Sequence, residues 1–254
     1  MCDATKWSAE ELCYFGFGAP IEAVASVAYR RTCRTYFEEP GFCLIDLGAD
    51  ASSTGIRRTM LKLSAAMSQL HQEQTGKKLV YLSAARFDQQ ESTRPHLDGG
   101  PEECFLMLGY EPSLVASEFE ISDYSRCAHE MGITPAEFLQ QHNPMFQNGR
   151  DILDGYTTRI PCFNEEHYQI LCVNNSSSSY GTSQDSNPGW QGVLHTATIS
   201  DPDEDCRRII NSTMIAPVSM EASGKLSDAE LEQFATTTAV KRRGYDKLHL
   251  KDDV

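Results

Sequence analysis

The chain has 254 residues, of which 40% are hydrophobic and 23% are charged, a balance typical of a soluble protein with a substantial core. Its net charge of −14, from 22 Lys and Arg against 36 Asp and Glu, disfavours nucleic acid and anionic membrane surfaces as partners. No apolar run is long enough to cross a bilayer, and the first residues lack the basic flank and apolar stretch of a signal peptide. We therefore expect a cytoplasmic protein whose residues 1–254 form a single domain.

Nine cysteines are spread widely along the chain, and no C-x-x-C pair occurs. An odd number at wide spacing disfavours a disulfide framework and a zinc–cysteine site. Cys104 and Cys172 lie in apolar, strand-like runs, where a reduced cysteine packs as a small hydrophobic side chain. We expect the cysteines to be reduced and structural.

The N-terminal third of the chain shows mainly helical patterns. Ser8, with Glu11 three residues later, forms a capping-box pattern at the start of a first helix. Apolar residues recur at helical spacing in 20–39 and again in 52–78. Between these two helices, the short apolar run 41–48 lies between glycines and predicts a strand.

Short apolar runs bounded by Gly, Pro, Asn, Asp or Ser follow from residue 79 onward, and this punctuation is typical of strands. One helical segment at 134–146 interrupts them, with Thr134 and Pro135 at its start. The predicted strands are 79–87, 104–111, 117–124, 156–163, 168–175, 192–199 and 208–217.

Helices followed by a series of strands predict an α+β fold built around a sandwich or barrel of strands. We divide the chain into a mainly helical part, 1–78, a strand core, 79–217, and a C-terminal helix and tail, 218–254. The polar stretch 174–190 is predicted to be a long loop, either a functional lid or a surface excursion.

His96 and Asp98 form the H-x-D sequence of this chain. Residues two apart on extended backbone project to the same side, as two ligands of one metal require. His195 differs from the other histidines because it lies within a predicted strand, just after the polar loop. Two histidines and one carboxylate make a facial triad, which leaves open positions and selects non-haem Fe(II).

An arginine stands at the head of the next predicted strand. Arg208 is followed by Ser212, and positions i and i+4 of a strand face the same way. A buried arginine requires an anionic partner, and its planar fork suits a carboxylate. Arg207 is the alternative, because strand alternation allows only one of the two arginines to point inward.

The order strand–PHLDGG–strand, then GVLH, then RRIINS resembles the iron(II)/2-oxoglutarate-dependent dioxygenases over about residues 79–217. This resemblance implies a double-stranded β-helix, or jelly-roll, core with the N-terminal helices packed outside the sheet. It also implies an enzyme that uses Fe(2+), 2-oxoglutarate as cosubstrate and O2 to oxidise a bound small molecule.

Carried over by position, the resemblance implies that His96, Asp98 and His195 hold iron. Arg208 would bind the far carboxylate of 2-oxoglutarate, assisted by Ser212. Because Asp98 occupies the carboxylate position, the reaction implied is hydroxylation or desaturation; halogenation would need that position vacant.

Other polar residues are candidates for contacts to small molecules. Tyr81 is a candidate for the cosubstrate, and alternation predicts that it shares a face with Ser83 and lies opposite Arg86. Arg86, Arg159 and Asn174, which is followed by a second asparagine, are candidates for the substrate. An arginine in the pocket would favour a carboxylated or amino-acid-like molecule.

Two other classes of protein stay open. A cupin-type jelly-roll binding protein, without 2-oxoglutarate chemistry, would draw its ligands from a tighter histidine cluster, and this chain has no H-x-H. A metal-independent isomerase on the same barrel would need a His–Asp pair and would keep its activity in chelator. The sequence does not indicate an oligomeric state.

Overall fold

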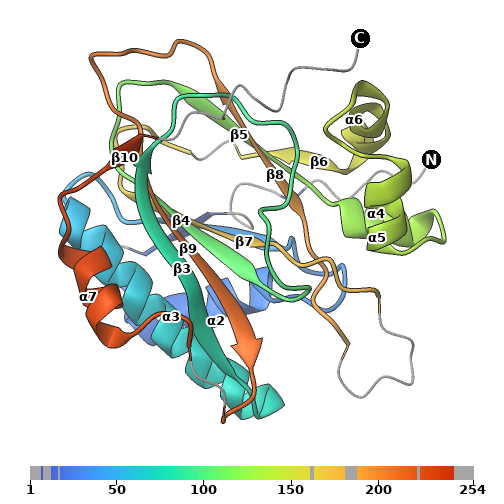
Figure 1. Ribbon diagram of the computed structural model, residues 1–254, viewed down its shortest axis with the longest axis horizontal. Helices are drawn as coiled ribbons and strands as arrows, with labels where there is room; N and C mark the ends of the chain where they lie inside the picture. The colour runs from blue at the N-terminus through green and yellow to red at the C-terminus, as the bar shows by residue number, and fades with distance from the viewer. Residues whose placement is uncertain are drawn as a thin grey trace.

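Two β-sheets and several helices make up the computed structural model, which describes residues 7, 13–16, 18–160, 163–180, 188–221 and 224–242 (Figure 1). The larger sheet has seven strands in the order β1 (Cys13–Phe15), β2 (Phe42–Asp46), β7 (Gln169–Asn174), β4 (Phe105–Tyr110), β9 (Ile209–Val218), β3 (Lys78–Asp88) and β10 (Lys241–Arg242). The smaller sheet has three strands in the order β6 (Thr157–Arg159), β5 (Ser117–Ser122) and β8 (Leu194–Ile199). The structure is thus a mixed fold of helices and sheets, compatible with the α+β class.

Helices α2 (Ile21–Thr32) and α3 (Ser53–Thr75) cover one face of the seven-stranded sheet, with α7 (Asp228–Thr236) beside α3 (Figure 1). Ser52 caps α3 by accepting a hydrogen bond from the Gly55 N–H, and the helix ends at Gly76, whose φ of 72° suits glycine. The apolar stripe predicted from helical spacing is buried against the sheet: Ile56, Met60, Leu63 and Met67.

The opposite face of the seven-stranded sheet packs against the three-stranded sheet. Leu106 and Leu171 of the larger sheet share this core with Phe119 and Ile121 of the smaller one. Strands β4 and β7 are buried along their whole length, because helices cover one face and a sheet covers the other. This explains why β4 and the interior of β7 are continuously apolar and do not alternate with polar residues.

The helices predicted in 20–39 and 52–78 are confirmed. The predicted strands are confirmed too, except that 156–163 is a strand only at Thr157–Arg159, and residues 161–162 lie outside the described residues. Three other expectations need correction. The first predicted helix is wrong where it is described: residues 13–15 form a strand that pairs in parallel with β2, and Ser8 and Glu11 lie outside the described residues. Strands β1, β2 and β10 also carry the larger sheet beyond the range 79–217.

The helix predicted at 134–146, with Thr134 and Pro135 at its start, is confirmed as α5 (Pro135–Gln141), and the third correction is that two short helices beside it were not predicted. These are α4 (Tyr124–Glu130) and α6 (Gln147–Leu153), which is followed by the 3-10 turn η1 (Asp154–Tyr156). Asp123 caps α4, and Thr134 with Glu137 forms a capping box on α5. Each helix is too short to produce a readable periodicity of its own.

None of the seven cysteines within the described ranges is in a disulfide, and six of them are buried, as expected for packing residues. Cys2 and Cys162 lie outside these ranges. None of the helices in the described part of the chain is both long and apolar enough to cross a membrane.

A buried ion cluster fastens α3 to the sheet. The Glu111 carboxylate, at the end of β4, lies 3.4 Å from Arg57 Nη1 of α3 and 3.1 Å from Arg86 Nη2 of β3. All three side chains are at most 9% exposed. Arg57 also donates to the carbonyl oxygens of Ala235 and Thr237, which ties the end of α7 to the same cluster.

We predict that Glu111→Gln lowers the free energy of unfolding by about 3–5 kcal/mol, because it leaves two buried guanidinium groups without a carboxylate. Urea denaturation followed by circular dichroism measures this loss. The control is Glu232→Gln on α7, which removes an exposed ion pair with Arg58 of α3 and is expected to cost far less, because solvent screens exposed ion pairs. Equal losses in the two variants would contradict the prediction.

Candidate metal centre

The segment after β3 is paired with the free edge of β8, and this pairing brings the two histidines together. The Thr93 N–H donates to the Ala197 carbonyl oxygen at 2.8 Å. His96 and His195 then exchange both backbone hydrogen bonds, at 3.3 and 3.2 Å, as an isolated antiparallel bridge. Because residues directly opposite each other in such a bridge place their side chains on the same face, the two imidazoles are neighbours.

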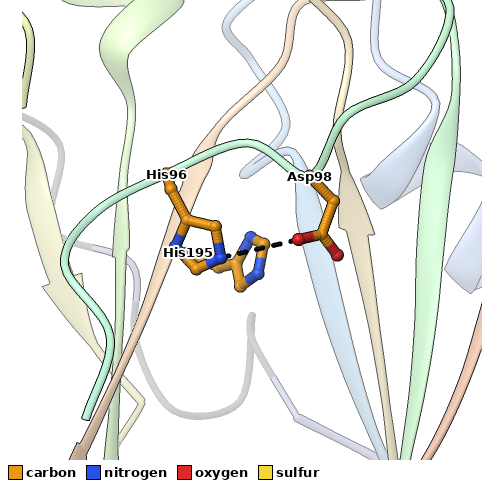
Figure 2. Close-up of side chains that lie close together, drawn as sticks. All are labelled: His96, Asp98 and His195. Carbon is orange, nitrogen blue, oxygen red and sulfur yellow. Dashed lines mark ion pairs between the residues drawn. The ribbon is translucent and has the colours of Figure 1, made fainter. Parts of the chain in front are cut away.

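Asp98 completes a cluster with the two imidazoles. One ligand atom from each of His96, Asp98 and His195 lies within 4.8 Å of the others. The imidazole centroids are 4.3 Å apart, and His96 Nε2 lies 3.6 Å from Asp98 Oδ1. Figure 2 shows His96 and Asp98 on one stretch of chain, with all three side chains pointing to the same small volume.

Local contacts set the protonation of both imidazoles. His96 Nδ1 lies 2.7 Å from the Arg94 carbonyl oxygen, which accepts its proton, and Nε2 is the ring nitrogen that faces Asp98. Burial lowers the pKa of His96, but hydrogen bonds to Asp98 and Arg94 outweigh it and raise the pKa overall. Burial, and secondly the neighbouring His96, lower the pKa of His195 to about 4, so this imidazole is neutral at pH 7.

The residues fit a first-row divalent metal such as Fe(II). Two imidazole nitrogens and one carboxylate oxygen are the donor set of the facial triad. The buried Nδ1 of His195 has no hydrogen-bond partner among the described residues, which is costly in the absence of a ligand. Within the same described set, this is the one group of three or more His, Cys, Asp or Glu side chains close enough to share an ion.

The cluster lies in a pocket of about 400 Å³ between the two sheets. Its wall is mostly apolar, with a few polar groups that converge on the interior. The lining residues are Phe87, Gln89, Thr93, His96, Leu97, Asp98, Gly99, Leu108, Tyr110, Phe119, His195, Ala197, Arg208, Ile210 and Ser212.

Arg208 contributes a buried cation to this pocket. Its Nε donates to the Ser117 hydroxyl at 3.2 Å, and its Nη1 donates to the Gln89 carbonyl oxygen at 2.9 Å. The Cζ atom lies 5.3 Å from the ring centroids of both Tyr110 and Phe119. No carboxylate of the described chain lies within ion-pair distance, and Nη2 has no hydrogen-bond partner there.

The electrostatics of Arg208 favour an anionic ligand. The residue is 2% exposed, and burial lowers the pKa of its guanidinium, an effect that Tyr110, Asp88 and Glu165 oppose. Burial also raises the pKa of Tyr110 to about 12, so the phenol next to the guanidinium is neutral at pH 7. A desolvated guanidinium with a free N–H is a good partner for a carboxylate.

The choice between the two adjacent arginines is settled by the fold. Arg208, Ile210 and Ser212 all line the pocket, as alternation along β9 requires. Arg207 is exposed, and its carbonyl oxygen accepts a hydrogen bond from the Ser113 hydroxyl at the surface. Of the predicted residues, the structure thus brings five into one pocket: His96, Asp98, His195, Arg208 and Ser212.

Tyr81 and Arg86 lie on the other side of the sheet. The register between β3 and β9 shifts between Tyr81 and Ser83, which marks a β-bulge. The bulge reverses the alternation, so Tyr81 and Arg86 both face the helices, contrary to the expectation that they lie on opposite faces. Neither residue lines the pocket, and Arg86 is held by Glu111.

Arg159 and Asn174 are also outside the pocket. Arg159 is exposed on β6, where it pairs with Glu118. Asn174 is fully buried at the end of β7, where its amide donates to the Thr32 carbonyl oxygen at 2.8 Å. Both residues were predicted to contact the substrate, but each side chain instead has a partner within the protein.

The start of the predicted loop 174–190 is packed and not free. The Ser177 N–H donates to the Glu102 carbonyl oxygen, and the Tyr124 hydroxyl donates to the Ser176 carbonyl oxygen. Ser176 and Ser178 are both buried. Residues 181–187, on which a lid would depend, lie outside the described residues.

Sequence reasoning missed the residues that surround Arg208. Gln89, Tyr110, Ser117 and Phe119 come from segments distant in the sequence, and none of them carries a local motif. Only the strand pairing that places Tyr110 opposite Ile210 identifies Tyr110 as a neighbour of the arginine. The sequence signal for these residues is limited to their location in or next to predicted strands.

No known protein-family model matches this chain, and no curated protein gives a significant match.

We predict that the metal-stripped protein binds one equivalent of Fe(II) or Co(II), and that His96→Ala or Asp98→Ala weakens this binding more than about 100-fold, since a lost ligand costs more than a lost outer contact. Anaerobic titration followed by absorption measures the dissociation constant. The control is His167→Ala: His167 Nδ1 lies 2.9 Å from Asp46 Oδ2, a His–Asp pair on a different part of the surface. Its binding constant should equal that of the wild type.

Proposed function

We propose that this protein is a non-haem Fe(II)- and 2-oxoglutarate-dependent oxygenase that acts on a small molecule. The observation that carries the proposal is that one pocket contains both the His96–Asp98–His195 cluster and the buried guanidinium of Arg208. A 2-oxo acid with a distal carboxylate can bind a metal at one end and an arginine at the other. Its keto-acid group suits a metal with open positions, and its far carboxylate suits an arginine without an acidic partner.

The arrangement of strands supports a jelly-roll core. Consecutive segments alternate between the two sheets: β3 in the larger, 92–96 against β8 of the smaller, β4 in the larger, β5 and β6 in the smaller, β7 in the larger, β8 in the smaller and β9 in the larger. Two packed sheets connected in this manner are typical of a jelly roll. We propose that helices α2 and α3 pack outside this core.

The proposal divides the roles in the pocket between metal ligands, residues that bind the cosubstrate and apolar residues. His96, Asp98 and His195 would hold the metal, which together with 2-oxoglutarate and O2 supplies the oxidising chemistry. Arg208 binds the far carboxylate of the cosubstrate through its free Nη2, and the Ser212 hydroxyl is on the same face to donate a second hydrogen bond. Phe119 and Ile210 exclude water from the ion pair, which strengthens it.

The pocket favours a substrate whose reacting part is uncharged. A volume of about 400 Å³ is in the range of small-molecule sites. Arg208 is the one Lys or Arg among the described lining residues, and the cosubstrate would occupy it. Arg86 and Arg159, which were candidates for binding a carboxylated or amino-acid-like substrate, are in ion pairs elsewhere.

We predict that the anaerobic Fe(II) protein develops a weak visible charge-transfer band with 2-oxoglutarate, and that Arg208→Ala needs about 100-fold more 2-oxoglutarate, because it removes one partner of a buried charge pair. The comparison compound is 2-oxopentanoate, which has the same chain length but lacks the far carboxylate. The wild type should prefer 2-oxoglutarate strongly, and Arg208→Ala should bind both compounds alike.

The control variant is Arg207→Ala, which removes the adjacent exposed arginine and should retain the wild-type preference. A protein that binds metal but gives no band with either compound would contradict the oxygenase proposal and favour a cupin-type binding protein. Catalytic activity that persists in chelator would instead favour a metal-independent isomerase.

A further inference from the structure

The main chain of Asp98 is held by a side-chain amide. Asn175 Oδ1 accepts a hydrogen bond from the Asp98 N–H at 2.9 Å, and Asn175 Nδ2 donates to the Asp98 carbonyl oxygen at 2.8 Å. The amide thus contacts both polar groups of one residue, as a neighbouring strand would. Asn175 is 3% exposed, so water does not compete well for these two hydrogen bonds.

Asn175 is itself fixed to the larger sheet. It directly follows the last residue of β7, and its N–H donates to the Cys104 carbonyl oxygen at 3.0 Å, just before β4. The next residue, Ser176, continues this contact through hydrogen bonds between its hydroxyl and the backbone of Cys104. The amide therefore projects from a rigid support.

The chain on either side of Asp98 is fixed two residues away. On one side, His96 is fixed by its bridge to His195. On the other side, Gly99 has open space where a Cβ would lie, and Gly100 packs closely against the side chains of Met214 and Cys104. Glycine allows a wide range of backbone conformations, so a fixed position for Asp98 requires a contact of its own.

We infer that Asn175 is a positioning residue for the acidic metal ligand: its amide fixes the backbone of Asp98, so that the carboxylate lies beside the two imidazoles. The inference rests on the proposed metal centre. An asparagine suits this role because it presents one acceptor and one donor at the separation of the backbone N–H and C=O groups. Alanine removes both contacts to Asp98, as well as the contact of Asn175 Nδ2 with Cys104 Sγ, and serine retains at most one of the contacts to Asp98.

The test compares Co(II) binding by the full-length wild type, Asn175→Ala and Asn175→Ser. We expect Asn175→Ala to weaken Co(II) binding about 10–100-fold, the usual effect of losing a contact that orients a metal ligand. We also expect a changed Co(II) absorption spectrum, because the spectrum reports the arrangement of the ligands. The Co(II) affinity of Asn175→Ser should lie between those of Asn175→Ala and the wild type. If the alanine variant fails to fold, the serine variant provides the test.

The matched control is Asn174→Ala, which also removes a buried amide with two hydrogen bonds, to Thr32 and Ser176, but has no contact with Asp98. It should lose stability in thermal unfolding of the metal-free protein and yet retain the wild-type Co(II) affinity and spectrum. Wild-type affinity and spectrum in both Asn175 variants would overturn the inference, as would equal weakening in Asn174→Ala. A wild type that binds no Co(II) would instead overturn the metal centre itself.

Discussion

The backbone bridge between His96 and His195 is the contact on which the candidate site depends. It joins a segment leaving the larger sheet to a strand of the smaller sheet, and it places the imidazole centroids 4.3 Å apart. Together with the Thr93 contact to Ala197, the bridge adds the segment 92–96 to the open edge of β8. The geometry of the cluster therefore depends on this edge pairing, and a change that detaches the segment from β8 also separates the imidazoles.

Buried arginines on the two faces of the larger sheet have different partners. On the helix side, Arg57 and Arg86 share the carboxylate of Glu111. On the pocket side, Arg208 has neutral oxygen atoms and aromatic rings around it, with Nη2 left free among the described residues. A buried charge without a partner is costly. Arg57 and Arg86 each have a carboxylate partner, whereas the Arg208 guanidinium is in no ion pair with any described residue, and this difference favours a ligand that brings its own carboxylate.

Local patterns predicted what depends on neighbours in the sequence. The H-x-D spacing identified His96 and Asp98, and helical spacing identified the buried face of α3. Pairings between distant segments were not predictable in this way. The bulge in β3 placed Tyr81 and Arg86 on one face, and no local residue marks it. Helical capping signals at Ser8 likewise did not anticipate the strand that follows, because β1 forms only by pairing with β2.

The two ends of the pocket differ in how firmly the fold holds them. Arg208 adjoins β9, which pairs along its length with β3 and over six residues with β4, so its register is fixed on both sides. A slip of one residue would exchange the pocket face of β9 for the face that carries Asn211 and the ion cluster. The metal end is supported by the sheet on one side only: His195 lies on β8, which pairs over six residues with β5, whereas His96 and Asp98 lie on a segment held by backbone pairing with β8 and by the Asn175 amide. The anion end is therefore preorganised by the sheet, whereas the metal end depends on a few specific contacts, of which the Asn175 amide is the one nearest to the carboxylate ligand.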